Sequence, residues 1–235
     1  EIAPSDWSSD VCSSDLHGLS RWLKMWIFFG IAGGLLFYFV LPNWKYRKKE
    51  ILPSEKPVLT FDDGPTEVTE EVLDILKDYS IQGYFFVLGE KALQRPKLIR
   101  RMKEEGHIVG LHAYIHRHGA LILPHVLWKD LRKGYEALMK LGIEPKFYRP
   151  THGFYTAISC LFSRMHGMKN FHWHALMRDW EKNEEGVVAK RLGKASAPGR
   201  ILVLHDGCEG SADPKAYQKM PEELRNSSKD RKSVV

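Results

Sequence analysis

Two adjacent carboxylates and two histidines four residues apart are the side chains best suited to bind a cation. Adjacent carboxylates such as Asp62 and Asp63 repel each other unless a cation or a proton-transfer role uses them. His112 and His116 have the i, i+4 spacing that places two imidazoles on one face of a helical turn, within reach of one ion. One Asp and two His with room for water are typical of a hydrolytic zinc site, so we expect metal-assisted hydrolysis.

Three further groups could transfer protons or bind substrate. They are Arg149 in Arg149–Gly153 (RPTHG), Asp179 before Trp180, and His205 after an apolar run. A second carboxylate can act as a base, and a distant His can act as an acid. Each group also has a plain interpretation: a turn, a surface ion pair, a helix N-cap or an exposed histidine, as for His118. Considered together, these groups favour a functional site, because each one follows an apolar run.

Those apolar runs alternate with helical patterns from about residue 51 onward. Strands are predicted at 57–61, 83–88, 107–111, 146–149, 170–176 and 201–205. Helices are predicted at 67–79, 91–105, 125–141, 154–167 and 184–195. This alternation favours a parallel sheet, either open or closed into a barrel. The carboxyl ends of parallel strands share one face, where sites are built, so the candidate residues should meet there.

The length of 235 residues suits one globular domain plus an appendage, or two small domains. Hydrophobic residues make up 43% and charged residues 27%, which excludes global disorder. Three cysteines are too few for a disulfide scaffold in a chain of this length. The net charge of +6 permits attraction to anionic membranes or wall polymers. The basic residues are dispersed except in 45–49, so we expect no nucleic-acid partner, and we expect a monomer.

Both ends of the sequence resemble translated sequencing adapters. Asp6–Leu16 (DWSSDVCSSDL) and Asp230–Val235 (DRKSVV) back-translate, each in frame, into opposite library adapters. We therefore interpret residues 1–16 and about 229–235 as assembly artefacts and exclude them from the fold. Pro221–Leu224 is typical of the start of a further helix, so we also expect the domain to be cut short at its C-terminus.

An apolar segment precedes the domain. Met25–Leu41 contains no charged residue, and aromatic residues near its edges favour a transmembrane anchor over 22–44. A signal peptide and a buried helix are the alternatives. Lys and Arg residues after the segment outnumber those before it, so the positive-inside rule alone would place the domain in the cytoplasm.

Taken together, the motifs over residues 51–228 resemble the polysaccharide deacetylases, or carbohydrate esterase family four, with its NodB-like domain. The matching segments are Thr60–Pro65 (TFDDGP), His112–His116 (His-x-x-x-His), Arg149–Gly153 (Arg-Pro-x-x-Gly), Asp179-Trp180 and Leu202–His205 (Leu-x-Leu-His). The sequence departs from the family at Ala113, where Ser or Thr is usual, and at Leu176, where Asp is often found.

The resemblance implies a distorted (β/α) barrel and assigns roles to individual residues. Asp63, His112 and His116 would bind a divalent metal, with zinc preferred. Asp62 would be the general base for a water at the metal, and Arg149 would pair with it. His205 would protonate the leaving amine, and Asp179 would tune His205 or Arg149. A backbone N–H near His152 would support the substrate carbonyl, and Trp180 and Leu204 would form walls of the acetyl pocket.

The implied function is removal of N-acetyl groups from polymers that contain N-acetylglucosamine, such as peptidoglycan, chitin-like chains or a lipid-linked amino sugar. The enzyme would be anchored to membrane lipid through its N-terminal helix, with the catalytic domain outside the cytoplasm. Two alternatives stay open: an inactive carbohydrate-binding homologue, and a different metal-dependent amide or ester hydrolase.

Overall fold

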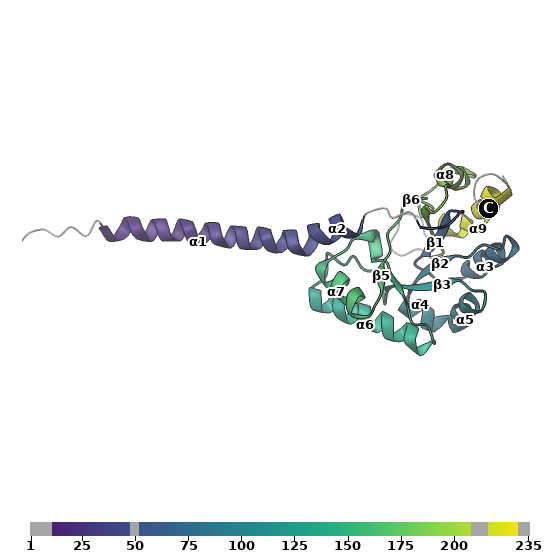
Figure 1. Ribbon diagram of the computed structural model, residues 1–235, viewed down its shortest axis with the longest axis horizontal. Coiled ribbons are helices and arrows are strands. Elements are labelled where there is room, and N and C mark those ends of the chain that lie inside the picture. The colour runs from purple at the N-terminus through teal and green to yellow at the C-terminus, as the bar shows by residue number, and fades with distance from the viewer. Residues whose placement is uncertain (1–10, 48–51, 208–215, 230–235) are drawn as a thin grey trace, which may run out of the picture.

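The computed structural model describes residues 11–47, 52–207 and 216–229 (Figure 1). Within them, seven strands form one parallel sheet in the order β5-β4-β3-β2-β1-β7-β6. The strands are β1 Val58–Asp62, β2 Tyr84–Leu88, β3 Ile108–Ala113, β4 Phe147–Tyr148, β5 Lys169–Asn170, β6 Ala175–Leu176 and β7 Ile201–His205. The sheet ends at β5 on one edge and at β6 on the other, so the predicted barrel is a curled, open one.

Helices connect the strands and cover the sheet (Figure 1). They are α3 Thr69–Asp78, α4 Gly89–Gln94, α5 Pro96–Glu104, α6 Pro124–Lys140, α7 Ala157–Met165, α8 Val187–Ala195 and α9 Met220–Lys229, with short 3-10 turns at η2 Thr151–Gly153 and η3 Ala216–Lys219. Thr156 and Ser159 form a capping box at the start of α7. Gly106 and Gly142 follow α5 and α6 with φ of 79° and 74°, the left-handed conformation that commonly ends a helix.

Side chains alternate along the strands between two hydrophobic clusters. Leu59 and Phe61 of β1 belong to the larger cluster, together with apolar side chains of the helices. Val58 belongs to a smaller cluster with Phe86, Phe171 and neighbouring residues. Because successive residues of a strand point to opposite faces, Thr60 and Asp62 lie on the same face as Val58. That face also carries the polar groups of the candidate site.

The predicted fold class is confirmed, but two predicted elements are wrong. The run 170–176 is not one strand, because it contains β5 and β6 at opposite edges of the sheet. The predicted helix 91–105 is two helices, because Pro96 takes the first position of α5 and Arg95 before it is non-helical, with φ of −128°. The predicted helix start at Pro221–Leu224 lies in α9.

The apolar segment is one continuous helical rod formed by α1 Val11–Leu35, the π-helical turn η1 Leu36–Val40 and α2 Leu41–Tyr46 (Figure 1). Within Arg21–Tyr46, an 18-residue stretch has a mean hydropathy of 1.9 and only 6% of it is buried, which contradicts the buried-helix alternative. By length and composition it is able to cross a membrane, as a signal sequence also is. Residues 1–10 and 230–235 of the predicted adapter segments lie outside the described residues.

Candidate functional site

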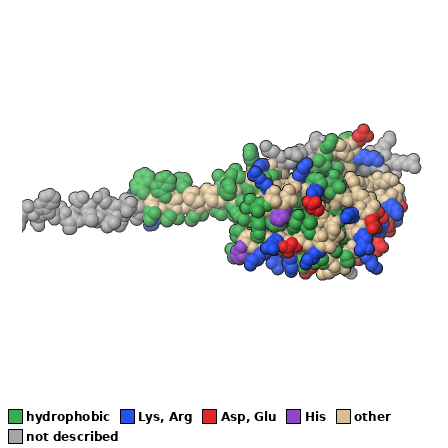
Figure 2. Space-filling model, turned by 60° about the horizontal axis from the view of Figure 1, so that its bottom comes forward, with side chains coloured by type: hydrophobic (Ala, Val, Ile, Leu, Met, Phe, Trp, Pro, Cys, Tyr) green, Lys and Arg blue, Asp and Glu red, His purple; other side chains and the backbone are tan. Residues whose placement is uncertain are grey.

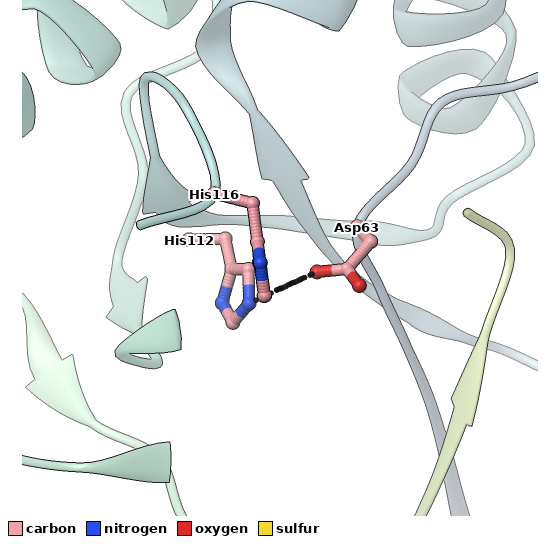
Figure 3. Close-up of side chains that lie close together, drawn as sticks. All are labelled: Asp63, His112 and His116. Carbon is pink, nitrogen blue, oxygen red and sulfur yellow. Dashed lines mark ion pairs between the residues drawn. The ribbon is translucent and has the colours of Figure 1, made fainter. Parts of the chain in front are cut away.

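Three side chains converge at the carboxyl ends of the central strands. Asp63 follows β1, His112 lies near the end of β3, and His116 lies in the loop after β3 (Figure 3). Asp63 Oδ1 lies 3.3 Å from the Nε2 atoms of both His112 and His116. Asp63 and His112 are buried. The predicted ligand set is therefore brought together by parallel strands, with its three ligand atoms within 4.8 Å of one another.

The loop that carries Asp63 has an unusual backbone that its neighbours hold in place. Asp63 has φ of 71°, a left-handed conformation that is uncommon for residues other than glycine. Lys91 Nζ donates a hydrogen bond to the carbonyl oxygen of Asp63 at 2.9 Å. Asp206 lies beneath the same loop, because a Cβ on Gly64 would meet its carboxylate at 2.1 Å. These contacts hold the backbone of the loop on both sides of Asp63.

Asp206 is itself bound by two threonines of the segment that follows this loop. Its Oδ2 accepts a hydrogen bond from Thr69 Oγ1 at 2.6 Å, and its backbone carbonyl accepts one from Thr66 Oγ1. Burial raises the pKa of Asp206 to about 7, although Thr69 and Lys91 favour its charged form. Lys91 and Asp206 were not predicted as site residues. Only the position of Asp206 directly after His205 could have indicated a role.

The two histidines do not lie on a helical turn, as their spacing had suggested. His112 belongs to β3, and the chain then bends through Tyr114 and Ile115 without forming a helix. Asp130 of α6 accepts hydrogen bonds from the backbone amides of Tyr114, at 3.0 Å, and Ile115, at 3.4 Å. A loop fixed by a carboxylate therefore takes the place of the predicted helix. Asp130 was missed because no local pattern links it to a motif 14 residues before it.

The orientation and charge of the three side chains suit cation binding. His112 Nδ1 lies 2.7 Å from the carbonyl oxygen of Arg149, so Nδ1 donates a hydrogen bond there and Nε2 is the ring nitrogen that faces Asp63. Burial lowers the pKa of His116 to about 4, which keeps its imidazole neutral at neutral pH. Burial alone would raise the pKa of Asp63, but its hydrogen bond and charge interactions with the histidines hold that pKa well below the usual range.

A buried ion pair fixes the second carboxylate. Arg149 Nη1 donates a hydrogen bond to Asp62 Oδ1 at 2.7 Å and another to Thr60 Oγ1 at 2.8 Å. The Arg149 side chain is fully buried, with its guanidinium carbon 4.2 Å from the centre of the Phe86 ring. The predicted pairing of Arg149 with Asp62 is thus present, and it involves one oxygen of the Asp62 carboxylate.

A histidine and carboxylate pair lies on the other side of β1. His205 is directly opposite Asp62 in the register of β1 and β7. Asp179 Oδ1 lies 2.9 Å from His205 Nδ1, and its Oδ2 accepts a hydrogen bond from the His205 backbone amide at 2.6 Å. Burial alone would lower the pKa of His205, but Asp179 more than offsets this and the pKa rises to about 9. The Trp180 ring lies edge-on to the His205 ring, with the two ring centres 4.8 Å apart.

The remaining two predicted residues differ in outcome. His152 lies beside the cluster, with its ring centre 4.5 Å from that of His116 and a left-handed φ of 56°. Leu204 does not face the site. It is fully buried in the larger hydrophobic cluster, on the opposite face of β7 from His205. The reason is strand alternation, by which Val203 shares the face of His205.

The donors present fit a divalent ion of the zinc type. Asp63 Oδ1 is buried and faces the Nε2 atoms of both histidines, so its charge is available to a cation held between the three side chains. Tetrahedral ligands at about 2.0–2.1 Å from a common zinc ion lie about 3.3 Å apart, the distance measured from Asp63 to both histidines. One carboxylate and two neutral imidazoles are also a common zinc donor set.

This sheet and this site define a family. Residues 49–171 match the polysaccharide deacetylase domain, which covers more than half of the chain, and the protein belongs to the polysaccharide deacetylase family. The fold agrees, because the crystal structure of the Bc1960 peptidoglycan N-acetylglucosamine deacetylase superposes with a TM-score of 0.69. That match has 27% sequence identity and covers 79% of this chain and 86% of the other.

Two curated relatives show the range of named activities. The peptidoglycan-N-acetylglucosamine deacetylase of Listeria monocytogenes is 32% identical over 155 residues, which are 65% of this chain and 33% of the relative. A chitooligosaccharide deacetylase of Sinorhizobium fredii is 33% identical over 153 residues, which are 64% of this chain and 71% of the relative. The chain therefore spans about one third of the length of the Listeria protein.

Proposed function

We propose that this protein hydrolyses the N-acetyl groups of polymers that contain N-acetylglucosamine. The observation that carries the proposal is an Asp-His-His cluster that shares the carboxyl ends of the central strands with a carboxylate, Asp62, and an imidazole, His205. Hydrolysis of an amide needs one group that accepts a proton and another that donates one. Here Arg149 binds a carboxylate on one side, and Asp179 keeps an imidazole protonated on the other.

Asp63, His112 and His116 would hold the metal ion. A divalent ion bound there supplies Lewis acidity, which polarises an amide carbonyl and increases the acidity of a neighbouring water. His112 is oriented for this by its hydrogen bond to the Arg149 carbonyl, and His116 by its burial in a neutral state. Zinc is the ion that this donor set favours.

The side chains then divide the proton transfers between them. Asp62 takes one proton from the attacking water, whose oxygen bonds to the acetyl carbonyl carbon. His205, protonated at neutral pH, gives its Nε2 proton to the amide nitrogen as the carbon–nitrogen bond breaks. The products are acetate and a free amine. Trp180 lies against His205 and would limit the acetyl group on that side.

The substrate class follows from the relatives, which are named for peptidoglycan N-acetylglucosamine and for chitooligosaccharides. Both polymers present an acetamido group on a glucosamine ring. We further propose that the apolar helix anchors the enzyme in the membrane and that the domain acts on the outer side, where peptidoglycan is found.

Acetate release tests the reaction. The full chain loaded with zinc should release acetate from N-acetylglucosamine oligomers or peptidoglycan, whereas Asp62→Asn should release none and yet bind one zinc ion per chain. Glu136→Gln, on the exposed face of α6, is the matched control and should behave like the wild type. A folded, zinc-loaded wild type that releases no acetate from either substrate would contradict the proposed function.

A further inference from the structure

The C-terminal end of the apolar helix is fixed to the domain by hydrogen bonds. Asn43 Oδ1 accepts a hydrogen bond from the backbone amide of Tyr155 at 3.1 Å, and Asn43 Nδ2 donates to the Tyr155 carbonyl at 2.7 Å. One amide side chain thus binds both backbone groups of a fully buried residue. The same Nδ2 donates to the Phe39 carbonyl, which fixes Asn43 within its own helix.

Two aromatic contacts and a buried proline extend this junction between the helix and the domain. Phe39 lies with its ring centre 6.1 Å from that of Phe154, and Tyr46 lies 5.6 Å from Tyr155. Pro42 between them is buried. The helix therefore contacts the domain along at least two turns, from 39 to 46, which makes independent movement of the helix and the domain costly.

This junction overlaps the part of the helix that a bilayer would cover. Lys24 and Lys45 bracket the apolar stretch and lie 21 residues apart, or about 31 Å along a helix, close to the thickness of a hydrocarbon core. Phe39 precedes Lys45 by six residues, so its contact with Phe154 lies about 9 Å along the helix from the charged boundary. A domain held at a distance from the membrane could not make the contact between Phe39 and Phe154.

The neighbouring helix α7 has a surface that suits this position. α7 packs against η1 and lies on the side of the domain from which the rod leaves (Figure 1). Its side chains Leu161 and Met165 are 48% and 64% exposed. Figure 2 shows hydrophobic side chains continuing from the rod onto the adjoining end of the domain. Lys45 and Arg164 are exposed there and would complement anionic headgroups.

We propose that the catalytic domain is seated in the membrane interface, with Leu161 and Met165 of α7 among the lipid headgroups beside the anchor. An apolar face at an interface commonly enters the headgroup and acyl boundary by about 5–10 Å, which agrees with the depth of the Phe39 contact. His152, whose ring lies beside that of His116, precedes Phe154 by two residues, so a short segment connects the site to this junction. The inference rests on the proposed membrane anchor and not on the proposed deacetylation.

Depth-dependent quenching tests this arrangement. The native cysteines are replaced (C12S, C160A, C208S), and one of three positions, Leu161→Cys, Phe29→Cys or Lys97→Cys, is labelled with an environment-sensitive fluorophore. Lys97 is the matched control, exposed on α5 at the far side of the domain (Figure 1). The labelled full chain is reconstituted in phosphatidylcholine and phosphatidylglycerol vesicles, with either nitroxide lipid or aqueous iodide as the quencher.

We expect nitroxide lipid to quench the labels at 161 and 29, and iodide to quench mainly the label at 97. Asn43→Ala should weaken lipid quenching at 161 and leave that at 29 unchanged, because it loosens the junction and not the span. Lipid quenching at 29 with iodide quenching at 161 would overturn the seating while keeping the anchor. Iodide quenching at both positions would overturn the anchor as well. Acetate release is a separate readout, so neither result bears on the proposed reaction.

Discussion

Asp179 holds His205 at two points: its Oδ2 accepts a hydrogen bond from the His205 backbone amide, and its Oδ1 lies 2.9 Å from the imidazole Nδ1. The carboxylate thereby fixes both the position of the imidazole and its proton. Because the pKa of folded His205 lies above that of an unfolded histidine, this proton stabilises the fold fully below about pH 6.5. The stabilisation is lost as the pH rises through about 9.

Replacing this carboxylate should move the alkaline limb of the activity profile. In Asp179→Asn the pKa of His205 should fall toward its ordinary value, because the largest interaction that opposes burial is removed and only the weaker effects of Asp63 and Asp62 remain. At pH 8 the protonated fraction would drop from about nine tenths to a few per cent, and kcat would fall by about 10- to 30-fold. A pH profile of kcat measures the shift. Glu181→Gln, a partly exposed neighbour that pairs with Arg178, is the control, and an equal profile in the two variants would contradict the role of Asp179.

Removing the support beneath the histidine loop should weaken metal binding without removing a ligand. Asp130→Ala leaves the amides of Tyr114 and Ile115 without their carboxylate, so His112 and His116 lose their fixed separation. Loss of such outer support commonly costs about 10- to 100-fold in metal affinity. Competition with a chelating dye measures the zinc dissociation constant. An affinity as high as that of Glu136→Gln would show that the loop holds its shape without Asp130.

The threonine beneath the Asp63 loop should contribute to stability. Thr69 Oγ1 accepts a hydrogen bond from the Thr66 amide at 2.8 Å and donates to Asp206, so Thr69→Val leaves two buried polar groups without a partner. The expected loss in the free energy of unfolding is about 1–3 kcal/mol. It should be larger at pH 8 than at pH 5, because Asp206 has a pKa of about 7 and needs the donor most when charged.

Denaturant unfolding at the two pH values measures that loss. Ser54→Ala serves as the control, since the Ser54 hydroxyl donates to the Lys56 carbonyl at the surface and its loss should change stability little. A loss in Thr69→Val that does not depend on pH would show that Asp206 is not the group left unsatisfied.

The strands were predictable from sequence where an apolar run ends in a polar motif, as for Asp62 and His205. Periodicity does not record which strand pairs with which, so 170–176 gave no sign that its two halves lie at opposite sheet edges. The spacing of His112 and His116 also suggested a helical turn. The structure has a loop there instead, and its conformation is fixed by Asp130 of α6. Strand alternation could have excluded Leu204 from the pocket, because it is adjacent to His205 and must point the other way.

The order of strands also determines when the protein can become active during synthesis. β1 pairs with β7 through Val58 and Ile201, 143 residues apart, whereas the three ligands for the cation come from β1, β3 and the loops that follow them. A chain made from its N-terminus completes those local pairings long before the last strand emerges from the ribosome. We therefore expect the Asp-His-His cluster to form first in a nascent chain, and His205, the proposed proton donor, to join it last.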